Sequence, residues 1–192
     1  MAAKTISATR RRNVTPTSSI LRIVTRDVDC SAFPYPPEDG QFVCAAGDVA
    51  TNPHAATFFG GAGYTATDAQ ASSLKMVWAS ALQTDRQALG NTRVPVLWLG
   101  GIEVECKLLN GDDDTTFGTT CPAGTLLSVK AAATSVQGTA QRLVLTPMAN
   151  GDAGWAVGYV TKSHTGDSAA GDRMADNKGI TVMLYDQPRK VG

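Results

Sequence analysis

Four cysteines are the residues of this 192-residue chain best suited to redox or metal chemistry. They stand at Cys30, Cys44, Cys106 and Cys121. No two have the two-residue spacing of a zinc or redox motif, so the sequence predicts no metal site and no cofactor. Reduced thiols are the favoured interpretation, because no apolar signal-peptide core precedes them. Disulfides joining Cys30 to Cys44 or Cys106 to Cys121 are the alternative, since each would close a short loop.

Nucleophilic catalysis would require a histidine placed beside a nucleophile and an orienting acid. His54 follows Asn52-Pro53, and His164 lies in a segment rich in serine, glycine and aspartate. The Gly-x-Ser-x-Gly turn that presents a nucleophilic serine is absent from the sequence. We therefore predict that both histidines are loop residues and that the protein is not an enzyme.

Two further segments have the residue types of ligand-binding loops but not their pattern. Gly60-Gly61-Ala62-Gly63 is not followed by the lysine and hydroxyl residue of a phosphate-binding loop. Asp112-Asp113-Asp114 offers consecutive carboxylates, whereas calcium loops alternate their ligands. Both segments are interpreted as turns.

The charge balance and the lengths of the apolar runs exclude several classes of partner. Lysine plus arginine total 17 and aspartate plus glutamate total 17, so the formal net charge is zero. Proteins that bind nucleic acid usually carry a basic excess to meet the phosphates. The longest apolar run, near Val94 to Leu99, is far shorter than the roughly 20 residues of a membrane helix. We expect neither a specific nucleic acid nor a membrane as partner.

Residues 1–26 differ from the rest of the chain, because they are basic, rich in serine and threonine, and free of acidic residues. They fit a transit peptide, a basic arm that lies on an acidic partner, or a solvated tail. Pro16 would interrupt the amphipathic helix of a transit peptide, which favours an extended N-terminal arm. If the arm binds a partner, the candidate contact residues are Arg10, Arg11, Arg12 and Arg22.

Residues 27–192 are predicted to form a β-rich domain of short strands. Ile102 to Leu108 is the clearest strand, because apolar residues alternate with Glu103, Glu105 and Lys107 and so predict one buried face. Lys75 to Trp78 is assigned as a strand, although Leu74 to Ala81 also fits helical spacing. Other strands are predicted at residues 20–25, 41–45, 125–130, 142–146, 155–161 and 180–185. The pattern predicts an all-β barrel or sandwich, with a division into two lobes near residues 110–120 as an option.

Several glycine-bounded segments follow one another in a distinctive order along the chain. Asp39 to Val43 comes first, followed by residues 84–88, 94–101 and 122–129. Gly154-Trp155-Ala156-Val157-Gly158-Tyr159-Val160, a polar loop and Gly179 to Tyr185 complete the series. In pattern, residues 39–186 resemble the decoration, or cement, proteins of tailed-bacteriophage heads.

This resemblance implies a β-barrel or tulip-like fold, commonly a homotrimer, and a non-enzymatic structural role. Such a protein binds the outer surface of the capsid and stabilises the joints between subunits of the major capsid protein. The implied partners are therefore the major capsid protein and further copies of this chain. The implied location is the exterior of a virion assembled in the host cytoplasm.

Three other classes of protein fit parts of the pattern. A phage tail-tube or head–tail connector subunit would also be β-rich and non-catalytic, but it would assemble into rings or tubes. A carbohydrate-binding module would need an exposed tryptophan at Trp78, Trp98 or Trp155, whereas their apolar neighbours favour a core or a subunit interface. A hydrolase would need a site assembled from distant residues.

Overall fold

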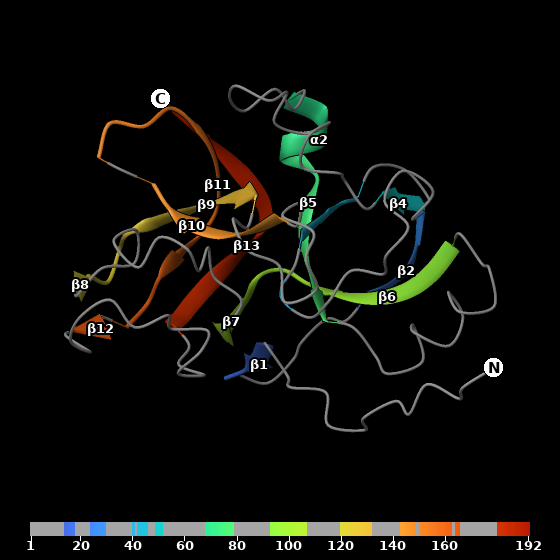
Figure 1. Ribbon diagram of the computed structural model, residues 1–192, viewed down its shortest axis with the longest axis horizontal. Helices are drawn as coiled ribbons and strands as arrows, with labels where there is room; N and C mark the ends of the chain where they lie inside the picture. The colour runs from blue at the N-terminus through green and yellow to red at the C-terminus, as the bar shows by residue number, and fades with distance from the viewer. Residues whose placement is uncertain are drawn as a thin grey trace, which may run out of the picture.

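The computed structural model of the protein describes residues 14–17, 24–29, 40, 42–45, 49–51, 68–78, 93–106, 120–131, 143–148, 150–162, 164–165 and 180–192. Most of these residues form strands, arranged as a closed barrel beside a six-stranded sheet (Figure 1). The prediction of an all-β fold is therefore confirmed.

The closed barrel is built from strands between residues 24 and 99. Around the barrel the order is β2 (Val24–Asp29), β4 (Val49–Thr51), β3 (Phe42–Cys44), β5 (Leu74–Trp78) and β6 (Arg93–Leu99). β6 returns to pair with β2 from Val24↔Trp98 to Asp29↔Arg93, and this pairing closes the barrel. The β2–β4 pair is parallel, and the other neighbouring pairs are antiparallel.

A short helix, α2 (Asp68–Ser72), precedes β5 and is the only helix among the described residues. It ends at Ser73, whose backbone N–H and hydroxyl both donate to the carbonyl of Gln70, at 3.2 Å and 2.8 Å. The strand predicted from Lys75 to Trp78 is confirmed, and the helical alternative is wrong for residues 74–78. The pairing of β5 with β3 and β6 accounts for the strand, because it satisfies backbone groups that a helix would bond internally.

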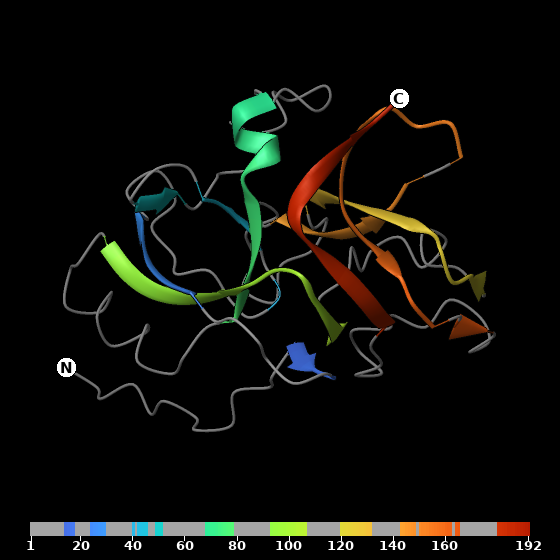
Figure 2. The same ribbon diagram turned by 180° about the vertical axis from the view of Figure 1, so that it is seen from behind.

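The six-stranded sheet combines strands from three parts of the sequence. Its order is β1 (Val14–Pro16), β7 (Ile102–Cys106), β13 (Ile180–Val191), β11 (Gly154–Val160), β9 (Leu126–Ala131) and β10 (Leu143–Pro147), and every pair is antiparallel. The long, curved β13 lies in the middle of the sheet, between β7 and β11 (Figure 2). A separate pair joins β8 (Thr120–Cys121) to β12 (His164–Thr165), so His164 lies in a two-residue strand and not in a loop.

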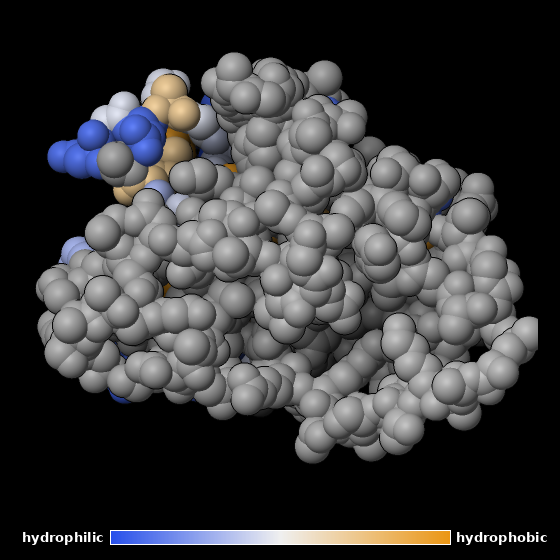
Figure 3. All heavy atoms as spheres, in the orientation of Figure 1, coloured by the Kyte–Doolittle hydropathy of each residue, from blue (hydrophilic) through white to orange (hydrophobic). Residues whose placement is uncertain are grey.

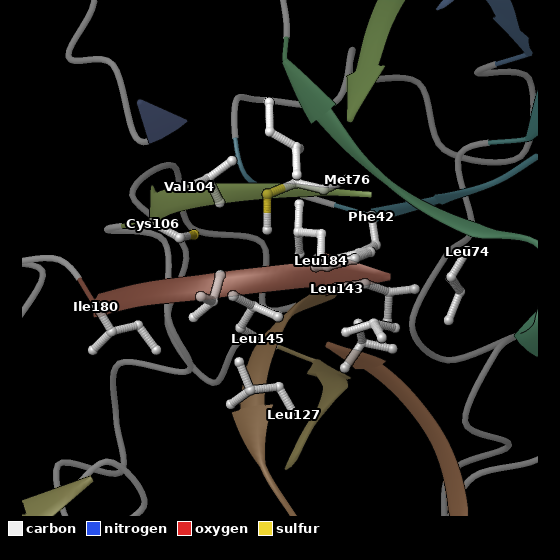
Figure 4. Close-up of a cluster of buried hydrophobic side chains, with 14 of the residues drawn as sticks. Phe42, Leu74, Met76, Val104, Cys106, Leu127, Leu143, Leu145, Ile180 and Leu184 are labelled. Atoms are coloured by element: carbon white, nitrogen blue, oxygen red, sulfur yellow. The ribbon is translucent and has the colours of Figure 1, made fainter. Parts of the chain in front are cut away.

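One face of the sheet packs against the barrel and forms a shared core. On β7 the predicted alternation is confirmed, since Ile102, Val104 and Cys106 are buried while Glu103 and Glu105 are half-buried. Side chains from the barrel strands β3 and β5 join the same cluster as the inner face of the sheet (Figure 4). The barrel contributes Phe42, Cys44, Leu74 and Met76.

The chain passes from barrel to sheet through Gly100 and Gly101, between β6 and β7. Gly101 has a φ of +64°, which a glycine adopts without a steric penalty. A Cβ on Gly100 would lie 3.3 Å from the carbonyl oxygen of Tyr185, so the turn also fits closely against β13. Lys75 and Asp186 add an ion pair of 3.8 Å between barrel and sheet. The two-lobe division expected near residues 110–120 lies largely outside the described residues. In the described structure the chain leaves the barrel and enters the six-stranded sheet at Gly100–Gly101.

The predicted arm, residues 1–26, overlaps two strands of the described structure. Val14–Pro16 form β1 at the edge of the sheet, and β2 begins at Val24, before the expected end of the arm. Arg26 takes part in β2 opposite Val96, so the basic composition of the segment continues into a barrel strand.

Strands β11 and β13 lie in close backbone contact at Gly158. The register between them shifts between Ala156 and Gly158, where a bulge interrupts the ladder. A Cβ on Gly158 would overlap the carbonyl oxygen of Met183 and lie 3.2 Å from the Cα of Leu184. Backbone atoms cannot move aside as a flexible side chain can, so this position requires glycine.

We expect Gly158→Ala to destabilise the protein by about 2 kcal/mol or more, because the added methyl group would push β11 away from β13. Gly100→Ala is the matched control, since its Cβ would meet backbone at 3.3 Å without overlap. Its expected cost is about 1 kcal/mol or less. Urea denaturation of the three proteins measures both values, and equal stabilities would contradict the assignment.

Candidate interaction surface

The predicted contact residues Arg10, Arg11, Arg12 and Arg22 lie outside the described residues. One described part of the arm, Val14 to Thr17, is bound to the sheet of its own chain. β1 pairs with β7 from Val14↔Cys106 to Pro16↔Val104. The backbone N–H of Thr17 then donates to the carbonyl of Glu103 at 3.1 Å.

The side chains of Thr17 and Glu103 form a second hydrogen bond that holds the end of β1 on β7. The Thr17 hydroxyl donates to Glu103 Oε1 at 2.6 Å. This hydrogen bond lowers the pKa of the Glu103 carboxyl, because it stabilises the charged form. The hydroxyl of Thr161 has a weaker effect in the same direction. Its Oγ1 is buried near the carboxylate but completes no hydrogen bond of ordinary geometry within the described structure.

The outer face of the sheet, opposite the shared core, carries a row of side chains across four strands. Leu126 on β9 lies opposite Tyr159 on β11, Tyr159 lies opposite Met183 on β13, and Met183 lies opposite Glu103 on β7. Directly opposed residues of antiparallel strands project to the same face. All four side chains are half-buried.

Tyr185 and Arg189 extend this row along β13. The rings of Tyr159 and Tyr185 are 5.8 Å apart between centroids and tilted by 43°. The guanidinium carbon of Arg189 lies 4.3 Å from the centroid of the Tyr185 ring, a cation–π contact. We call the residues Leu126, Tyr159, Met183, Tyr185 and Arg189, with Glu103 and Glu105 at their margin, the outer-face patch.

The chemistry of the outer-face patch suits binding. Tyrosine, methionine and arginine are enriched in protein interfaces, because each offers a large contact area together with polarisable or charged groups. Within the described ranges, no group of three or more histidine, cysteine, aspartate or glutamate side chains is arranged to hold a metal ion. Among the same residues, no helix has the length and apolar character needed to span a membrane.

Two of the four cysteines have described side chains, and both are buried and outside any disulfide. Cys44 belongs to β3 and Cys106 to β7, and both pack in the shared core. Neither of the disulfides considered from the sequence is therefore formed. Burial raises the pKa of the Cys44 thiol to about 12, because the apolar surroundings disfavour the thiolate.

Trp155 is the one tryptophan whose side chain the structure describes, and it is half-buried. Its backbone lies opposite Lys190 near the start of β11. The side chains of Trp78 and Trp98, and the segments with His54, the glycine run and the three aspartates, lie outside the described residues.

Comparison with protein-family models, with curated proteins and with solved structures finds no match to this chain. The outer-face patch therefore rests on its geometry alone. Sequence reasoning missed it, because its residues lie on four strands that the sequence does not show to be neighbours. The alternation of Thr181, Met183 and Tyr185 with buried residues was the available signal.

Thr17→Val is expected to raise the pKa of Glu103 towards the ordinary glutamate value, because the donor to the carboxylate is lost. The folded-state pKa is lowered, so the contribution of this contact to stability is complete above the ordinary glutamate pKa. It fades as the pH falls through the folded-state value. An NMR titration of the Glu103 carboxyl in both proteins measures the shift. An unchanged pKa would contradict the Thr17 contact.

Cys44 is expected to resist iodoacetamide at pH 8 in the native protein. With a pKa of about 12, only about one Cys44 thiol in ten thousand is ionised at this pH. Burial also limits the access of the reagent to the sulfur atom. Mass spectrometry should find Cys44 and Cys106 unmodified in the native state and modified in denaturant without reductant. Modification that required a reductant would instead place these residues in disulfides.

Proposed function

We propose that this protein is a non-enzymatic structural protein that binds the outer surface of a phage capsid and stabilises the joints between major capsid protein subunits. The resemblance of residues 39–186 to phage decoration proteins suggests this role. The all-β fold and an outer sheet face rich in interface residues are compatible with it.

The observation that carries the proposal furthest is the anchoring of the arm. β1 (Val14–Pro16) pairs with β7, and Thr17 is bound to Glu103 by two hydrogen bonds. The three arginines at positions 10–12 precede this fixed strand by one residue in sequence. A basic segment tethered to a rigid sheet edge is suited to an acidic protein surface, because less of the chain must be ordered on binding.

Stabilisation of the capsid would follow from mass action. A protein that binds only the expanded arrangement of the shell stabilises that arrangement by the free energy of binding, summed over its sites. No catalytic step is needed, since every contact formed across a joint opposes its separation.

The proposal is tested by co-sedimentation with shells of the phage that encodes the chain, before and after expansion. Wild-type protein should pellet with expanded shells and not with unexpanded ones. Replacement of Arg10, Arg11 and Arg12 by alanine should weaken binding by about tenfold or more, with the loss largest at low salt.

Lys190→Ala is the control, because this exposed lysine lies near the far end of β13, opposite Trp155 and away from the strands β1 and β7 that hold the arm. Equal pelleting with both shells, or none with either, would contradict the proposal. Rings or tubes of the protein alone in electron micrographs would instead indicate a tail-tube or connector subunit.

A further inference from the structure

We propose that the outer-face patch is the surface through which two copies of this chain bind each other. The inference goes beyond the proposed capsid role and rests on the expectation, implied by the resemblance, that the chain binds further copies of itself. It assigns the contact to named residues on β7, β11 and β13.

The centre of the patch is apolar and preorganised. Met183 lies between Tyr159 and Glu103 across the sheet, and Leu126 continues the row on β9. The contact between Tyr159 and Tyr185 fixes the two rings against each other. Strand backbone and ring contacts limit the side-chain entropy that an interface would have to remove on binding.

The margins of the patch carry opposite charges. Glu105 lies on β7, opposite Thr15 of β1 on one side and Thr181 of β13 on the other. Glu103, two residues away, is held by Thr17. At the other margin Arg189 stacks on Tyr185 near the end of β13. Figure 3 shows hydrophilic side chains beside apolar ones in the region where the C-terminus lies.

This distribution of charge favours a second copy of the chain over other occupants. A uniformly acidic partner would match Arg189 and oppose Glu105, and a uniformly basic partner would do the reverse. A second copy that faces the patch in the opposite direction places its Arg189 beside Glu105 of the first copy, and its Glu105 beside Arg189. Complementary charge around an apolar centre is the pattern of a specific interface.

Sedimentation equilibrium of the full chain over a range of concentrations tests the inference by charge reversal. Glu105→Lys and Arg189→Glu should each weaken self-association by about tenfold or more, because each places like charges together across the interface. The double variant should recover most of the wild-type affinity. An equimolar mixture of the two single variants should also associate, since opposite charges then face each other.

Gln70→Lys is the control for a new charge outside the patch, because this exposed residue lies on α2, and it should leave the mass unchanged. Tyr159→Ser tests the apolar centre independently and should also weaken association about tenfold. Circular dichroism confirms that each variant is folded. A wild-type protein that is monomeric at all concentrations, or single reversals that change nothing or are not rescued by the double variant or the mixture, would overturn the inference.

Shell binding separates this inference from the proposed function. Glu105→Lys leaves the arm intact, so individual copies should still pellet with expanded shells. An oligomer insensitive to every patch variant that still binds shells would overturn the inference alone. A wild-type protein that fails to bind shells but shows charge rescue would overturn the capsid role alone.

Discussion

The shared core between the barrel and one face of the six-stranded sheet determines how every other surface is presented. Phe42, Leu74 and Met76 of the barrel pack among the buried residues of the sheet, including Val104 and Leu184. Side chains alternate along a strand, so burying one set sends the other set outwards. A one-residue slip of β13 would place Met183 and Tyr185 in the core and expose their neighbours. The choice of residues that pack against the barrel therefore determines which residues form the outer face of the sheet.

Local pattern predicted individual strands better than their ends. β7 could be predicted because apolar and acidic residues alternate without interruption from Ile102 to Cys106. β13 was predicted to end at Tyr185 but continues to Val191. Its second half lies beyond the bulge, where Asp186, Gln187, Arg189 and Lys190 are exposed and the alternation is lost. The five residues of α2 are too few for a helical period to show in the sequence.

Pairing between distant strands escaped prediction, and with it the candidate site. The parallel pairing of β2 with β4 and the closure of the barrel by β6 depend on contacts that no single segment encodes. The outer-face row joins Glu103, Leu126, Tyr159 and Met183, and each is unremarkable in its own segment. The basic composition of residues 1–26 instead predicted a site at the arginines of the arm. The described structure adds that the residues after them are bound at the edge of the sheet.

The strand order also has a consequence for the order in which the chain is made. All five barrel strands lie between residues 24 and 99, so the barrel has its complete set of strands early in synthesis. The sheet does not, because β13 separates β7 from β11. Until residues 180–191 leave the ribosome, β7 lacks its central neighbour and the barrel lacks its cover. In a nascent chain Phe42, Leu74 and Met76 therefore lack their packing partners on β13 until the last strand is made.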